Sequence, residues 1–129
     1  MKKNKLEKMK KRADVLMLSG RIEKALRLFD EMLELDKSYA LALKGRGCAL
    51  ACLGREDEAE ECFDTVLREN PRDIGALNGK ASICSARGNN REAIEYCNKA
   101  LAILPGDYTT LTLKDNFLEE LGLPREMFA

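Results

Sequence analysis

The sequence of 129 residues contains no histidine, no tryptophan and no glutamine, and only 5% of its residues are aromatic. Without histidine, neither a Ser–His nor a Cys–His nucleophile pair can form, and no imidazole is present to bind a metal. No nucleophile–base pair and no ligand set stands out among the remaining carboxylates, lysines, tyrosines and cysteines. We therefore expect a protein that is not an enzyme and that holds neither a metal nor a cofactor.

Neither sign of charge is in excess, since 22 Lys and Arg residues balance 22 Asp and Glu residues. Surfaces that bind nucleic acid or membranes usually carry an excess of charge of one sign, so we expect neither nucleic acid nor a membrane as a partner. No apolar run approaches the roughly 18–20 residues of a membrane span, and no apolar segment of a secretory signal follows the basic start. A cytoplasmic location is expected. The basic block from Lys2 to Arg12 is interpreted as a solvated first helix, with an acidic partner or RNA as the alternative.

The five cysteines are odd in number, and their spacings fit neither a disulfide framework nor a CxxC zinc module. We interpret them as reduced thiols of a cytoplasmic protein. Cys48 and Cys52 lie four residues apart, on one face of an expected helix. A metal or redox site would need further ligands nearby, so these two are interpreted as small packing residues.

The sequence repeats itself at a spacing of 34 residues, which is the strongest signal it contains. The glycines of one column can take the left-handed conformation that ends a helix, and the prolines close each unit. Apolar residues recur at three- and four-residue steps inside each half-unit, as on one stripe of a helix. The columns are Gly20, Gly54, Gly88 and Gly122; Ala25, Ala59 and Ala93; Phe29, Phe63 and Cys97; Leu33, Leu67 and Leu101; the small residues Ala13, Gly47 and Ala81; and Lys37, Pro71 and Pro105.

The register predicts an all-α fold of antiparallel helix pairs in a single domain, 1–129. The units fall at about 6–39, 40–73 and 74–107, and are followed by one more helix at about 108–122 and a tail at 123–129. Asp73 and Asp107 are expected to cap the helices that follow them.

These columns resemble the signature of the tetratricopeptide repeat (TPR) family, over nearly the whole chain. Two departures are the basic residues Arg12, Arg46 and Lys80, where the family usually has Leu, and Lys37 in place of Pro. The resemblance implies a right-handed α–α superhelix, a solenoid whose first helices line a concave groove and whose last helix covers the end. It also implies a scaffold protein that binds a peptide or helix of another protein in this groove.

The resemblance places the partner-binding residues on one face of the first helices. They are Lys10, Asp14 and Met17; Lys44, Gly45 and Cys48; Asn78, Gly79 and Ser82; and Asn116 of the last helix. Gly45 and Gly79 occupy one place of the unit, inside a helix, where each costs about 1 kcal/mol relative to Ala. Either a neighbouring helix of the same chain or the backbone of a ligand approaches there.

Many TPR domains hold the acidic C-terminal tails of chaperones in a clamp of Lys and Asn residues. Lys10 stands at one such Lys position, but Asp14 stands where its Asn partner would be, and Gly45 where the next Asn would be. We therefore expect that chaperone tails are not partners. The alternative function is that of an assembly subunit, including a homodimer, that self-associates through the ends of the repeats or through Leu123, Met127 and Phe128.

Overall fold

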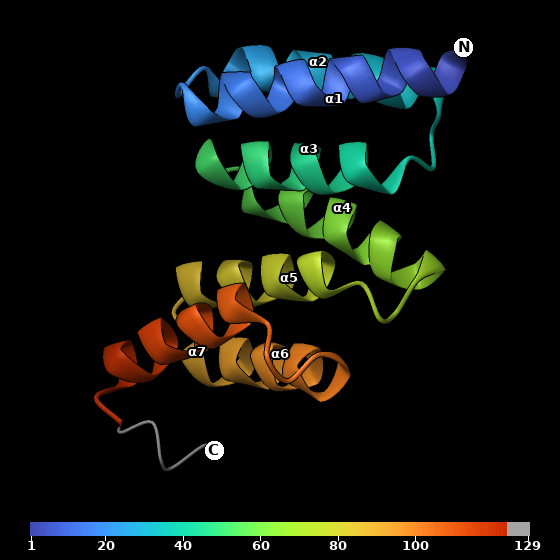
Figure 1. Cartoon of the computed structure of the whole chain (residues 1–129). Helices are drawn as coiled ribbons and strands as arrows, with labels where there is room; N and C mark the ends of the chain where they lie inside the picture. The colour runs from blue at the N-terminus through green and yellow to red at the C-terminus, as the bar shows by residue number, and fades with distance from the viewer. Residues whose placement is uncertain (124–129) are drawn as a thin grey trace. The chain divides into compact units, whose positions relative to one another are not determined.

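The computed structural model describes residues 1–123, which form seven α-helices and no strand (Figure 1). The three predicted repeats and the final helix are confirmed, and α1 begins four residues before the expected start of the first unit. The predicted contacts of Met127 and Phe128 lie outside the described residues. The helices are α1 (Lys2–Leu18), α2 (Ile22–Leu35), α3 (Ala40–Cys52), α4 (Glu56–Glu69), α5 (Ile74–Ala86), α6 (Asn90–Ile103) and α7 (Tyr108–Leu121).

The recurrent glycine follows the first helix of each pair and has the left-handed conformation that its column predicted. Gly20, Gly54, Gly88 and Gly122 have φ values of 79°, 78°, 84° and 71°. The amide of the residue after each glycine donates back into the helix, as from Arg21 N to Leu16 O at 2.8 Å. This bond closes the helix end and reverses the chain into the next element.

Aspartates cap the starts of α5 and α7, as expected. Asp73 accepts a hydrogen bond from the backbone amide of Ala76 at 2.9 Å, and Asp107 accepts one from that of Thr110 at 3.0 Å. Each bond satisfies an amide that has no partner inside the helix. The Thr110 hydroxyl also donates to Asp107, and these bonds hold the pKa of the Asp107 carboxyl below its usual value.

The chain divides into two compact units, and each is described by itself. In the first, Met1–Val66, α1 lies along α2 and α2 packs against α3. Small residues allow the helices to approach closely, because a Cβ atom on Gly47 of α3 would lie 2.8 Å from the Phe63 ring of α4. Arg46 also joins these helices, since its guanidinium donates to Asp30 of α2 at 2.8 Å and to the Cys62 sulfur of α4 at 3.1 Å.

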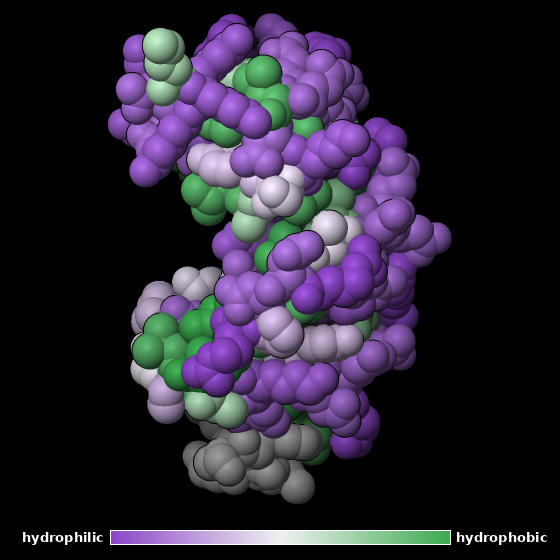
Figure 2. Space-filling model, turned by 90° about the vertical axis from the view of Figure 1, so that its right-hand side faces the viewer, coloured by the Kyte–Doolittle hydropathy of each residue, from purple (hydrophilic) through white to green (hydrophobic). Residues whose placement is uncertain are grey.

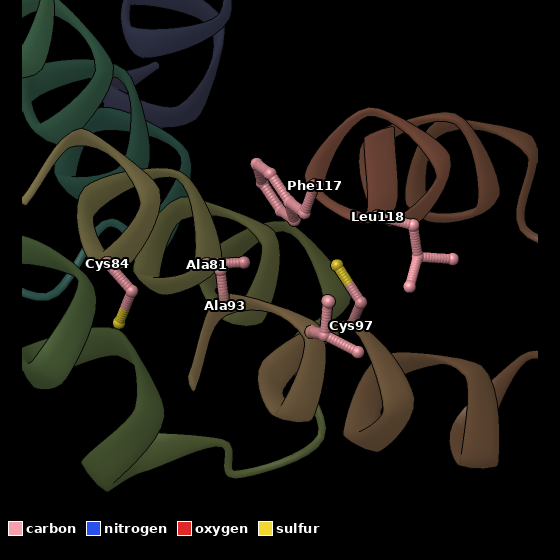
Figure 3. Close-up of a cluster of buried hydrophobic side chains, with 7 residues drawn as sticks. Ala81, Cys84, Ala93, Cys97, Phe117 and Leu118 are labelled. Carbon is pink, nitrogen blue, oxygen red and sulfur yellow. The ribbon is translucent and has the colours of Figure 1, made fainter. Parts of the chain in front are cut away.

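In the second unit, from Leu67 onward, α7 packs against α5 and α6. Figure 3 shows Phe117 and Leu118 extending from α7 toward these two helices, and both side chains are buried. Cys97 lies in the same hydrophobic cluster and is fully buried, as its core column predicted. Lys80, also buried, has its ammonium 5.7 Å from the centre of the Tyr96 ring. The single domain predicted from the sequence stays a prediction.

Hydrophilic side chains cover most of the face drawn in Figure 2, and hydrophobic ones reach the surface in separate places. None of the helices in residues 1–123 is both long and apolar enough to cross a membrane.

Candidate functional site

The first unit contains a surface hollow of about 310 Å³ between α1 and α3. Apolar side chains from α1, α2 and α3 line it, and its charged side chains come from α1 and α3. The lining residues are Lys10, Asp14 and Met17 of α1, Phe29 of α2, and Leu41, Lys44, Gly45 and Cys48 of α3. We call this site the α1–α3 hollow.

Helical spacing explains why these side chains face the same space. Lys10, Asp14 and Met17 are separated by four and three residues, which places them on one stripe of α1. Lys44 and Cys48 follow Lys10 and Asp14 by 34 residues each, so α3 presents the same stripe one repeat later. The structure therefore brings together six of the ten residues that the resemblance implied for partner binding.

The floor of the α1–α3 hollow depends on the contact between Phe29 and Gly45. A Cβ atom on Gly45 would overlap the Phe29 ring, whose Cδ1 atom would lie 2.9 Å away. The close approach at Gly45 therefore comes from a neighbouring helix of the same chain, which is the first of the two interpretations given above. The ring is only 1% exposed, so it supports the base of the hollow from beneath, and the apolar surface that solvent reaches comes from Met17 and Leu41.

Two of the charged side chains that line the hollow, Lys10 and Asp14, form an ion pair with each other. The Lys10 ammonium donates to both carboxylate oxygens of Asp14, at 2.8 and 2.7 Å. Lys44 brings a second positive charge from α3. The positive charge of Lys10 is thus already matched before any partner binds.

Cys48 is exposed as a residue, and it lines the hollow. Partial desolvation of its sulfur raises the pKa of the Cys48 thiol, and the nearby Cys52 adds to the rise. The positive charges of Lys10 and Lys44 oppose it. A protonated thiol is a poor nucleophile at neutral pH. Among the described residues, no group of His, Cys, Asp or Glu is placed to hold a metal ion. The arrangement offers a surface for binding.

The other four predicted residues belong to the second unit. The Asn78 side-chain oxygen lies 3.1 Å from the Thr110 hydroxyl, whose single proton it shares with Asp107, and this contact joins α5 to the first turn of α7. Gly79 and Ser82 lie further along α5, and Ser82 is exposed. Asn116 lines a second hollow, on α7.

Phe29 and Leu41 line the α1–α3 hollow but were not among the predicted site residues. Leu41 could have been found, because it begins the stripe that continues at Lys44 and Cys48. Phe29 belonged to a core column, and nothing in the sequence shows that one edge of a core ring also forms the floor of a hollow.

The helix pairs and their glycine turns define an α-helical repeat protein of the solenoid class. The sequence matches the tetratricopeptide repeat profile over residues 10–61 and again over residues 46–108, so the chain belongs to the tetratricopeptide repeat family. Domains of this family are protein-interaction modules, and the family is generally non-enzymatic. A comparison with curated proteins found no match.

Solved structures with the same fold include two that hold peptides. The second TPR domain of human RPAP3, in complex with the HSP70 peptide SGPTIEEVD, is 18% identical, with a TM-score of 0.76 over 91% of this chain and 98% of that chain. The Yersinia enterocolitica type III secretion chaperone SycD, in complex with a peptide of the translocator YopD, is 16% identical, with a TM-score of 0.75 over 92% and 95%.

A tetratricopeptide repeat protein from Parabacteroides merdae is 26% identical, with a TM-score of 0.80 over 88% of this chain and 44% of that chain. These likenesses confirm the all-α fold. Because similar structures hold chaperone-derived peptides, they do not support the expectation that chaperone tails are excluded, which stays a prediction.

Proposed function

We propose that this protein is an interaction module that holds a peptide or helix of a partner protein in the α1–α3 hollow. The observation that carries the proposal is the pairing of accessible apolar side chains, Met17 and Leu41, with charged side chains at Lys10 and Lys44. A partner segment with one apolar side chain could pack it against Met17 and Leu41 while its polar neighbours contact the rim.

The size of the hollow supports a side-chain anchor over a small-molecule ligand. Its volume of about 310 Å³ is at the lower limit of the roughly 300–1,000 Å³ that ligand pockets usually have. Peptide recognition by helical proteins commonly uses such anchors, with polar contacts around them. The five free cysteines would remain thiols in the cytoplasm, where we expect this module to act.

The charge arrangement also bears on which peptides bind. A carboxylate that approached Lys10 would meet the Asp14 carboxylate, which already lies 2.7 Å from the ammonium. Binding would require the partner to displace Asp14 or to tolerate its negative charge. We propose that acidic chaperone tails are therefore poor ligands, and that the apolar anchor contributes most of the binding energy.

Affinity purification from the source cell, followed by mass spectrometry, tests the function. Wild-type protein is compared with Met17→Lys, which places a charge in the hollow, and with Glu31→Lys, which places one on an exposed site of α2 outside it. We expect a set of partners that Met17→Lys loses and Glu31→Lys keeps. Recovery of every partner by Met17→Lys, with an unchanged circular dichroism spectrum, would overturn the proposal.

The HSP70 peptide SGPTIEEVD found with human RPAP3 tests the exclusion of chaperone tails directly. We expect no saturable binding by isothermal titration calorimetry at micromolar peptide concentrations. Tight binding that Lys10→Ala or Lys44→Ala abolishes would show that the Lys10–Asp14 pair does not prevent a carboxylate clamp.

A further inference from the structure

A stripe of exposed basic and apolar side chains runs along α1, away from the α1–α3 hollow. Apart from the adjacent Lys11 and Arg12, neighbouring members are three or four residues apart, which places them on one side of the helix. They are Lys8, Lys11, Arg12, Val15 and Leu18, all exposed, with Val15 at 64% and Leu18 at 90%. We call this surface the α1 stripe.

The repeat register shows what kind of surface the α1 stripe is. The residues of α3 that correspond to Lys11 and Arg12 are Gly45 and Arg46, 34 positions later. These two residues contact α2, through Phe29 and Asp30 respectively. The α1 stripe is therefore the side of a first helix that a helix can cover, and among residues 1–123 its own members are exposed.

The second unit has an open hollow of about 640 Å³ along α7. Apolar side chains line it at Tyr108, Leu111, Leu118 and Leu123, and the charged side chains that line it are Asp115 and Glu119. Tyr108 is 81% exposed and Leu111 is 41% exposed, so large apolar side chains face solvent here. We call this site the α7 hollow.

The same register indicates that the α7 hollow fits a helix. Leu111 and Asp115 correspond to Leu77 and Ala81 of α5, which are 5% and 0% exposed. Ala81 lies in a hydrophobic cluster with Ala93 and Ile94 of α6, so a helix packs at this place of the repeat. On α7 the corresponding place carries the Asp115 carboxylate, and Glu119 follows four residues later, so a helix that packs here meets two negative charges.

From this complementarity we infer that the α7 hollow binds the α1 stripe of a second copy of the chain, head to tail. The stripe supplies the cations Lys8, Lys11 and Arg12, and the hollow supplies the anions Asp115 and Glu119. Val15 and Leu18 meet the exposed apolar side chains of α7. The contact leaves the α1–α3 hollow accessible, because that hollow is lined by Lys10, Asp14 and Met17 on another side of α1.

A contact between two different surfaces is heterologous, so it adds copies one after another unless the rotation closes a ring. Association should therefore increase continuously with protein concentration. Because the charges involved are exposed, it should weaken as salt shortens the range of their attraction. Because each copy contributes one face of a single helix, the interface is expected to be at the small, weak end of protein–protein interfaces.

Sedimentation velocity of the full chain at several concentrations, in low and in high salt, tests the inference. Two charge-reversed variants test the two surfaces separately. Lys11→Glu/Arg12→Glu changes only the α1 stripe, and Glu119→Lys changes only the α7 hollow. We expect wild type to associate in low salt and each variant alone to associate at least tenfold more weakly. Mixing the two variants should restore association, because the mixture contains one intact stripe and one intact hollow.

Matched controls are Lys24→Glu/Arg27→Glu on α2 and Glu95→Lys on α6, which make the same charge changes at exposed positions outside both surfaces. They should associate as wild type does. A monomeric wild type at millimolar concentration would overturn the inference, as would undiminished self-association of Lys11→Glu/Arg12→Glu alone, which would indicate pairing of two α7 hollows. Deletion of residues 124–129 should leave association unchanged, and its appearance only after the deletion would show that the tail occupies the hollow.

Discussion

Replacing Gly45 with alanine should destabilise the protein, although the same change in an open helix would stabilise it. Alanine is favoured over glycine inside a helix by about 1 kcal/mol. Against this gain, the new Cβ atom would overlap the ring of Phe29. The ring is 1% exposed and cannot move aside without disturbing the core between α2 and α3.

The balance of these two effects sets the magnitude. Forcing an extra carbon into a well-packed core costs typically about 1–3 kcal/mol. After subtracting the gain in helix propensity, Gly45→Ala should lower the free energy of unfolding by roughly 1 kcal/mol. For a chain of this size, that corresponds to a decrease in melting temperature of about 4 °C.

A double-mutant cycle in urea separates the ring from other causes. In a Phe29→Leu background the obstruction is removed, so Gly45→Ala should become stabilising, with a coupling energy of roughly 2 kcal/mol. Gly106→Ala is the control, because a Cβ atom there meets nothing within 4 Å and its φ is not positive; it should be neutral or slightly stabilising. If Gly45→Ala stabilises the wild-type background instead, the reasoning about the ring is wrong. If stability is unchanged but partner binding is lost, a ligand backbone approaches Gly45 as well.

Three further measurements test the cysteines and the second unit. Burial raises the pKa of the Cys97 thiol from 9.0 to about 11. Between these values the folded state keeps a proton that the unfolded chain loses, so the free energy of unfolding should fall by ~2 kcal/mol as pH rises from about 9 to 11. Cys97→Ala should remove this fall. Iodoacetamide at pH 8 should modify the exposed Cys52 of the native protein, modify Cys48 more slowly because the pKa of its thiol is raised, and spare Cys97 until unfolding, as mass spectrometry of peptides would show. Equal modification of all sites would contradict the burial. Phe117→Ala should cost about 3–5 kcal/mol in urea unfolding, whereas Leu111→Ala, at a site 41% exposed, should cost under about 1 kcal/mol.

The helices and their ends could be predicted because each depends on local chemistry. The glycine column marked the turns, since a left-handed residue is needed wherever a first helix stops. Asp73 and Asp107 marked helix starts in the same way. The interpretation of the basic block from Lys2 as part of the first helix agrees with the start of α1 at Lys2, whereas the boundary of the first unit at about residue 6 is later because the lysine-rich first turn has no apolar period.

The candidate site could be predicted only in part, because it depends on which helices meet. The 34-residue register placed Lys10 and Lys44 on equivalent stripes, and the structure brings them to one hollow. The partner of Gly45 could not be read from the sequence, because it is an aromatic ring on another helix. The pairing of Lys10 with Asp14 was available from their spacing of four residues, and it changes the charge that a partner meets.

The basic residues that depart from the family pattern connect the packing with the proposed assembly. Inside the units these cations are engaged: Arg46 binds Asp30 and the Cys62 sulfur, and Lys80 lies over the ring of Tyr96. The contacted residues Cys62 and Tyr96 are themselves 34 apart, so one arrangement recurs in both units. Arg12 has the same place on α1, where the side chain is exposed. The basic residue that contacts a second helix in α3 and α5 is therefore an exposed cation on α1, opposite in charge to the Asp115 and Glu119 carboxylates of the α7 hollow.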